Sequence, residues 1–91
     1  MLKDLGRLDE AEGLLRETVT IDLEVYGPKH PTYGTSLHNL ASVIKDLGRL
    51  DEAEGLFREA YEIFSAMWGK DHPSSNIVFG NWQAVKEFLS K

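Results

Sequence analysis

The sequence predicts an all-α fold made of antiparallel helix hairpins in tandem, about four helices in all, and three observations lead to this prediction. Residues 3–14 and residues 45–56 both read KDLGRLDEAEGL, so the chain repeats itself with a period of 42 residues. Apolar residues recur at the i, i+3, i+4, i+7 spacing of amphipathic helices. No segment shows the alternation that is typical of strands. With 91 residues, the chain has room for one domain.

The first predicted helix spans about residues 9–26 and corresponds to the second helix, helix B, of a hairpin. Residues 1–6 match residues 43–48, the last turn of the first helix, helix A. The first hairpin therefore lacks most of its helix A, and we expect the chain to be truncated at its start. Three positions of this helix B would normally pack on the missing helix: Ala11, Leu15 and Thr18. Either they form a modest exposed patch, or a second copy of the chain covers them.

A complete hairpin follows in the middle of the chain. Its helix A carries apolar residues from Leu37 to Leu47 and ends at Gly48, a residue that readily adopts a left-handed conformation. We expect Asp51 to cap helix B, with Glu54 completing a capping box. That helix runs to Trp68, and the short link makes its two helices antiparallel neighbours.

The last predicted helix spans about residues 74–90 and resembles a helix A that no helix B follows. Gln83 and Lys86 are polar where the preceding copy has Ala41 and Ile44. This pattern predicts a capping helix with a polar outer face, at a natural end of the chain. Its packed face would consist of Phe79, Trp82, Val85 and Leu89.

The central copy resembles a tetratricopeptide repeat of the 42-residue type found in kinesin light chains. The resemblance rests on the HP start, the SLHNLA segment of helix A, the LGRLDEAEGLFREA hairpin and the WGKDHP link. It covers nearly the whole chain and divides it into a partial first repeat (residues 1–29), a complete repeat (residues 30–71) and a capping helix (residues 72–91). The resemblance implies an α-solenoid that serves as a protein–protein interaction scaffold.

By this resemblance, the A helices line a concave groove that binds an extended peptide or partner segment. The predicted groove residues are Thr35, His38, Asn39, Ser42, Lys45 and Asp46, with Ile77, Asn81, Ala84 and Phe88 from the next A helix. Asn39 and Asn81 are equivalent in the two copies, and an amide side chain can both donate to and accept from a peptide backbone. Alternatively, the two asparagines satisfy hydrogen bonds between helices.

The sequence offers no pattern for catalysis, a cofactor or a metal. There is no cysteine, which excludes disulfides, thiol catalysis and cysteine zinc sites. His30 and His72 are equivalent residues that both precede a proline, so we expect them at helix N-termini rather than as metal ligands. The Walker, dinucleotide-binding and serine hydrolase motifs are missing. We therefore expect no enzyme activity.

The net charge of −5 is unevenly distributed. Residues 9–25 carry a net charge of −5 and residues 51–67 carry −4, so the rest of the chain sums to +4. One interpretation is that these acids simply form two solvated outer faces. The other is that the surface of the A helices, which is neutral to basic by comparison, prefers acidic or C-terminal carboxylate segments and contacts them through Lys45. The acidity disfavours nucleic acid as a partner. No apolar run suits a membrane or a signal peptide, and the composition fits an intracellular, cytoplasmic protein.

The alternative function is self-association, in which another chain covers the incomplete first repeat in a homodimer. Leu23 and Phe64 occupy positions that are usually polar in such repeats. Either their exposure has no role, or they extend this contact or a contact with the last helix. The predicted self-association residues are Ala11, Leu15, Thr18, Leu23 and Phe64.

Overall fold

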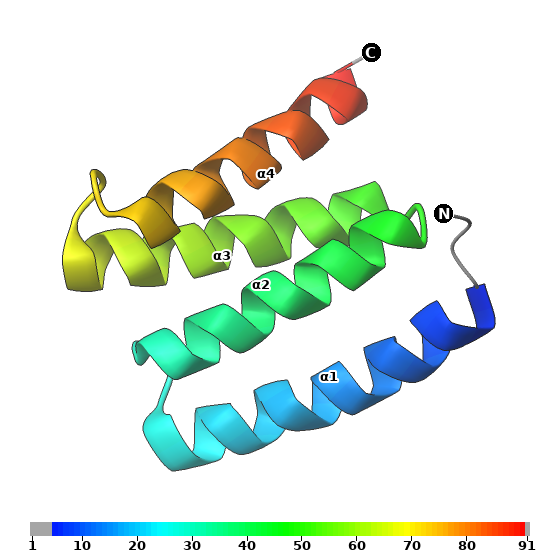
Figure 1. The fold of residues 1–91 in the computed structure, drawn as a ribbon, viewed down its shortest axis with the longest axis horizontal. Coiled ribbons are helices and arrows are strands. Elements are labelled where there is room, and N and C mark those ends of the chain that lie inside the picture. Colours follow the sequence, from blue (N-terminus) through cyan, green and yellow to red (C-terminus); the bar gives the residue numbers. More distant parts are fainter. Residues whose placement is uncertain (1–4, 91) are drawn as a thin grey trace.

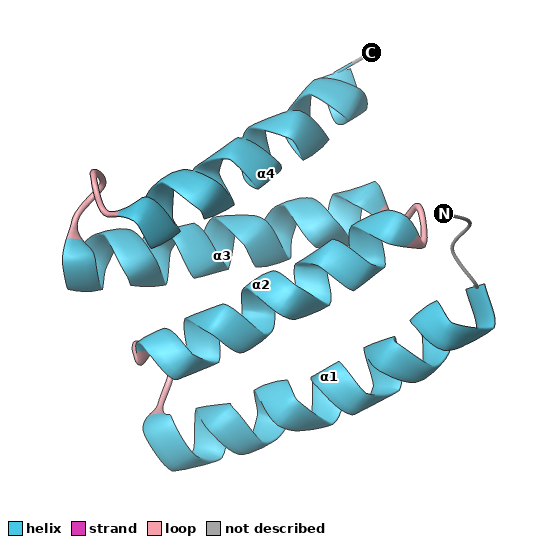
Figure 2. Ribbon diagram, viewed as in Figure 1, coloured by secondary structure: helices cyan, strands magenta, loops and turns pink. Residues whose placement is uncertain are grey.

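The computed structural model describes residues 5–90 and confirms the all-α prediction. Within this range the chain forms four helices: α1 (Leu5–Tyr26), α2 (Pro31–Asp46), α3 (Leu50–Trp68) and α4 (Pro73–Ser90). Short turns join them, and the described segment contains no strand (Figure 2). Each helix runs antiparallel to the one before it, and each packs on its neighbour in chain order (Figure 1). The order is therefore B–A–B–A in the terms of the repeat.

The most completely buried part of the core lies between α2 and α3. Ala41 and Ile44 from α2, together with Ala53, Phe57 and Ala60 from α3, have no exposed surface. The alanines are small, so the two helix backbones approach closely and Phe57 fills the space beside them. Burying a phenylalanine side chain of this kind contributes about 1.5–3 kcal/mol to the free energy of unfolding.

Histidine and proline begin α2 in the way the sequence indicates. His30 has an extended backbone (φ −83°, ψ 138°), and its Nδ1 accepts a hydrogen bond from the Thr32 N–H at 3.0 Å. His72 repeats this contact before α4, where its Nδ1 accepts from the Ser74 N–H at 3.1 Å. Both imidazoles thus satisfy N–H groups that have no partner within the helix. The prediction of a structural role for these two histidines is confirmed.

The start of α3 differs from the prediction that Asp51 is its N-cap. The N-cap is Arg49, no side chain caps the helix, and Asp51 lies in the first turn. The reason is the tightness of the turn, in which Gly48 (φ +86°) reverses the chain and the Arg49 carbonyl already accepts from the Ala53 N–H at 3.0 Å. Asp51 still benefits from the positive end of the helix dipole.

The start of α1 also differs from the prediction. Residues 1–4 lie outside the described segment, but Leu5 and Gly6 belong to α1 instead of ending a helix A. Gly6 is the equivalent of Gly48 within an identical twelve-residue sequence. At Gly48, backbone N–H groups donate to carbonyls of the last turn of α2 and so close the reversal. The same local sequence is therefore compatible with a helix that continues through this glycine and with one that ends at it.

Three apolar side chains are placed differently from their predictions. Phe64 is 4% exposed, because its ring packs beside Gly34 of α2 and stacks on Trp68 with ring centroids 5.5 Å apart. Phe79 and Leu89 were expected in the packed face of α4, and each is 41% exposed, although the Phe79 ring does contact Tyr61 of α3 with ring centroids 5.4 Å apart. The buried face of α4 consists of Ser75, Val78 and Val85, with Trp82 partly buried.

Two helical glycines provide a test of the close approach between α2 and α3. A Cβ atom at Gly34 would lie 3.1 Å from Ile63 Cγ2 and 3.2 Å from a ring carbon of Phe64, whereas Gly13 of α1 has open space around it. We expect Gly13→Ala to stabilise the protein by about 0.5–1 kcal/mol through helix propensity. Gly34→Ala should be net destabilising, since overpacking costs about 1–3 kcal/mol. Urea unfolding measures both, and a stabilising Gly34→Ala would contradict the packing described.

Candidate functional site

The residues predicted to bind a partner lie on one side of α2 and on the adjacent part of α4, a surface that we call the A-helix face. Thr35 and Asn39 are exposed on α2. His38, Ser42, Lys45 and Asp46 are half-buried there, while α4 contributes the half-buried Asn81 and the exposed Ile77, Ala84 and Phe88. The regular spacing of these positions along each helix places them on one side of it.

His38 and Asn81 connect the two helices of this face. Asn81 Nδ2 lies 2.9 Å from His38 Nε2, over a separation of 43 residues. Burial of His38 lowers the pKa of its imidazole, and the nearby charge of Lys45 acts in the same direction. A neutral His38 can accept the hydrogen bond that the Asn81 amide donates. Asn81 thus makes a contact between helices, as one of the two alternatives anticipated.

Asn39 differs from its equivalent in the next repeat. Its side chain is exposed, and no hydrogen bond from it is present within residues 5–90. A short distance along α2 and α4 lies a cavity of about 420 Å³. Its lining comes from α2, the turn that follows it, the start of α3 and α4: Lys45, Asp46, Gly48, Leu50, Ala84, Val85 and Phe88. The A-helix face therefore combines a free amide, a lysine and an apolar hollow.

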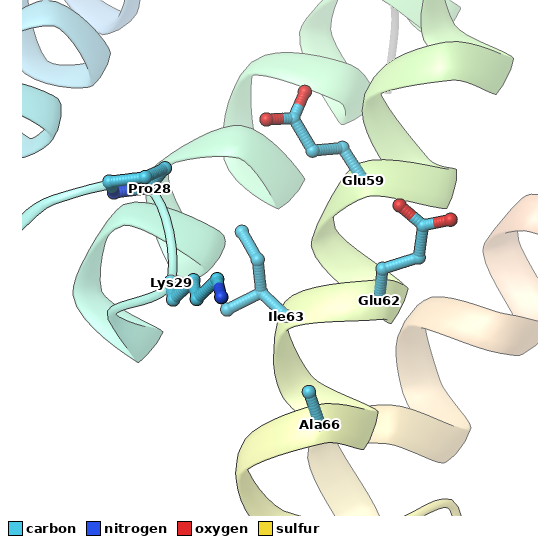
Figure 3. Close-up of a pocket in the computed structure, with 6 residues that line it drawn as sticks. All are labelled: Pro28, Lys29, Glu59, Glu62, Ile63 and Ala66. Carbon is cyan, nitrogen blue, oxygen red and sulfur yellow. The ribbon is translucent and has the colours of Figure 1, made fainter.

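A second hollow, of about 370 Å³, lies between the α1–α2 turn and α3 (Figure 3). Pro28 and Lys29 form one side of it, and Glu59, Glu62, Ile63 and Ala66 form the other. Glu59 accepts a hydrogen bond from the Tyr33 hydroxyl at 3.2 Å. Burial and the Glu59 carboxylate both raise the pKa of Tyr33. The sequence analysis missed this site, because the turn and α3 are about 30 residues apart in the chain.

Four charged side chains join α1 to the start of α3. Arg49 contacts Glu12 at 2.8 Å and Glu52 at 2.7 Å, and Arg16 contacts Glu12 at 2.8 Å and Glu52 at 2.5 Å. Hydrogen bonds from Arg49 and Arg16 lower the pKa of the Glu12 carboxyl, and the same two arginines lower the pKa of Glu52. The sequence analysis did not predict this cluster. Its only sequence signal is that the four residues fall at fixed positions of the repeat, which becomes informative once the structure is known.

Two further polar contacts between helices escaped the sequence analysis. Asp22 is buried and accepts a hydrogen bond from the Ser36 hydroxyl. Its position is equivalent to that of Phe64, so a carboxylate stands where the next repeat has a buried ring. Glu54 accepts from the indole N–H of Trp82 at 2.7 Å, which joins α3 to α4 instead of completing a capping box.

The five residues predicted for self-association do not form one exposed patch. Thr18 and Leu23 are exposed and Ala11 is half-buried. Leu15 is half-buried and packs against the hydrophobic core, so its own chain covers it. Phe64 is buried, as described for the fold. The expectation is therefore wrong for the accessibility of Phe64 and for the direction in which Leu15 packs.

Residues 5–90 contain no group of three or more histidine, aspartate or glutamate side chains that could hold a metal ion. Among the described helices, none is long and apolar enough to cross a membrane. The polar clusters of this segment are instead the contacts between helices described above.

The fold defines a class of helical-repeat protein, an α-solenoid in which antiparallel helices stack in chain order. A family model of the tetratricopeptide repeat matches residues 1–66, well over half of the chain. The chain therefore belongs to the tetratricopeptide-repeat family, whose members are generally protein–protein interaction modules and typically non-enzymatic scaffolds. No curated protein sequence matches the chain.

The lowered pKa of His38 predicts a pH-dependent stability. The unfolded chain protonates His38 near pH 6.5, whereas the folded state resists protonation. The unfolded state consequently binds more protons below that pH, and the free energy of unfolding should fall as the pH drops from 7.5 to 5. The lowered pKa values of Glu12 and Glu52 add to this fall only toward the acid end of the window, and they do so equally in the His38 variant. Urea unfolding between pH 5 and 8 should show that the free energy of unfolding depends less on pH in His38→Gln than in the unaltered protein. An equal pH dependence in the two proteins would contradict the lowered pKa of His38.

Proposed function

We propose that the chain is a protein–protein interaction module that binds an extended peptide segment of a partner on its A-helix face. Two observations carry the proposal: the Asn39 amide is exposed on α2, and an apolar cavity opens further along the same helix at Lys45 and Asp46. An extended segment carries unpaired backbone N–H and C=O groups, and one amide side chain can serve both. The cavity offers room for an apolar side chain of the same segment.

The rigidity of the face supports this proposal. His38 and Asn81 bridge α2 and α4 through the hydrogen bond between their side chains. A fixed surface loses little conformational entropy when a partner docks, which leaves more of the interaction energy for affinity. Thr35 and Ser42 lie along the same side of α2 as Asn39 and can add contacts to the bound segment.

The charge distribution supports a preference for acidic or carboxylate-containing segments. Most acids of the chain lie on α1 and α3, whereas Lys45 borders the cavity of the A-helix face. A carboxylate of the bound segment would be repelled by the acidic helices and attracted by this ammonium group. Asp46 also lines this cavity, so its carboxylate offsets part of that attraction.

We further propose the unit boundaries that the repeat implies: a partial repeat over residues 1–29, a complete one over residues 30–71 and a capping helix over residues 72–91. The turns around His30 and His72 support these divisions, because both histidines cap the helix that follows. The period of 42 residues also supports the kinesin-light-chain-like type of repeat.

A peptide-display selection followed by fluorescence anisotropy tests the proposed face. We expect the Asn39→Ala, Asn81→Ala double variant to bind the selected peptides about 10-fold more weakly. Asn39→Ala removes a hydrogen bond to the bound segment, worth about 0.5–1.5 kcal/mol, and Asn81→Ala removes the bridge to His38 that joins α2 to α4. Ala84→Arg should weaken binding as well, because the longer side chain would fill the cavity. Gln83→Ala, elsewhere on α4, is the matched control and should bind normally. Equal binding by all variants would exclude the A-helix face.

A further inference from the structure

The interface of α1 with α2 and that of α3 with α4 use equivalent positions of different chemistry. At the first interface, the Ser36 hydroxyl donates a hydrogen bond to the Asp22 carboxylate, and both residues are buried. One period later the same positions are Phe64 and Val78, which are 4% and 1% exposed and belong to the hydrophobic core. A buried polar pair at one interface therefore corresponds to an apolar pair at the other.

A second set of equivalent positions differs in size between the two interfaces. Between α3 and α4, the Tyr61 ring centroid lies 5.4 Å from that of Phe79 and 5.6 Å from that of Trp82. The equivalent positions between α1 and α2 are aliphatic: Val19, Leu37 and Leu40. In both sets, the residues on the two sides of an interface differ together, so that each interface is matched within itself.

Duplication creates the need for such matching, because it makes the helices similar enough to be exchanged. The identical segments 3–14 and 45–56 provide the first turns of α1 and α3, and α2 and α4 both begin after a His–Pro pair. An arrangement in which α3 of a second copy replaces α1 on α2 is therefore a competing structure. A sequence selects one structure only if it also disfavours its competitors.

The exchanged pairings would bury groups that do not match. If α1 packed on α4, the Asp22 carboxylate would face Val78, whose side chain has no hydrogen-bond donor. If α3 packed on α2, the Phe64 ring would face Ser36, and the hydroxyl of Ser36 would lose its carboxylate acceptor. Removing one partner from a buried polar pair costs more than the intact pair contributes to stability. Each exchange is therefore penalised.

We propose that these matched residues determine which helix B each helix A accepts. Through Asp22 and Ser36, α2 accepts α1 and rejects α3. Through Phe64 and Val78, α4 accepts α3 and rejects α1. The buried polar pair thus specifies the order of the helices by what it excludes, and a helix B from a second copy of the chain is excluded in the same way. The proposal concerns contacts inside the stack and does not depend on the A-helix face.

Three variants of the full chain test the proposal, and all three keep the amino-acid composition and the net charge of the unaltered protein. The B-exchange variant combines Asp22→Phe with Phe64→Asp, and the A-exchange variant combines Ser36→Val with Val78→Ser. The matched-exchange variant carries all four substitutions, so that each interface receives the pair that belongs to the other. Urea unfolding gives the equilibrium constant of unfolding for each variant.

We expect both half exchanges to raise the equilibrium constant of unfolding. The B exchange should raise it about 100-fold or more, because it buries a carboxylate without a donor. The matched exchange should unfold at least about 10-fold less readily than the B exchange, although it carries two further substitutions. Ser36→Val and Val78→Ser would then destabilise the unaltered protein and stabilise the B-exchange variant, and this change of sign measures the pairing.

A milder set of variants at the α1–α2 interface keeps the proposal testable if an exchange variant does not fold. Ser36→Ala removes the donor of Asp22 and should raise the equilibrium constant of unfolding about 10-fold. In an Asp22→Leu background, the same substitution should change the constant less than about 2-fold, because no carboxylate then needs a donor. Thr35→Ala, at the exposed neighbouring position of α2, is the control and should act equally in both backgrounds.

Three outcomes would overturn the proposal. The first is a B-exchange variant as stable as the unaltered protein, because the helices would then tolerate the mismatch. The second is a matched exchange in which the effects of the two half exchanges multiply, which would show that the four positions act independently. The third is an equal effect of Ser36→Ala with aspartate and with leucine at position 22, because the hydrogen bond would then play no part in the matching.

Discussion

The close packing of α2 on α3 is the constraint on which the rest of the structure depends. Alanines at the contact allow the two backbones to approach, and Gly34 leaves no room for a side chain where Ile63 and Phe64 cross it. Each of these helices also has a second neighbour, so the position of α1 follows from α2 and the position of α4 follows from α3. The A-helix face exists because both A helices are fixed in this way.

Duplication gave equivalent residues to both repeats, and the structure uses them differently according to their neighbours. Asn81 bonds His38 of the preceding A helix, whereas Asn39 is exposed. Glu12 pairs with arginines, whereas its equivalent Glu54 accepts from Trp82. Equivalent residues can therefore differ in whether, and with which partner, they form a hydrogen bond. Asn39 of the A-helix face is one whose amide remains exposed.

The sequence was sufficient to predict the elements that depend on local patterns. The repeat and its helical periodicity predicted the fold class, and the His–Pro pairs predicted the turns before α2 and α4. Gly6 and Asp51 show the limit, because Gly6 lies within α1 although its equivalent Gly48 ends α2, and the tight turn at Gly48 moved the start of α3 ahead of Asp51. The bridge between His38 and Asn81 was also beyond local reasoning, since it joins residues 43 positions apart. Equally, periodicity alone could not tell which side of α1 its own chain would cover.

Native-state hydrogen exchange measured by NMR tests the central claim, that the α2–α3 pair holds the fold while α1 is packed on one side only. Amides of Leu40, Ile44, Phe57 and Ala60 should exchange only through global unfolding. Amides on the outer side of α1, such as those of Leu14 and Ile21, should exchange through openings of clearly lower free energy. Equal protection of α1 and α3 in the isolated chain would contradict the account.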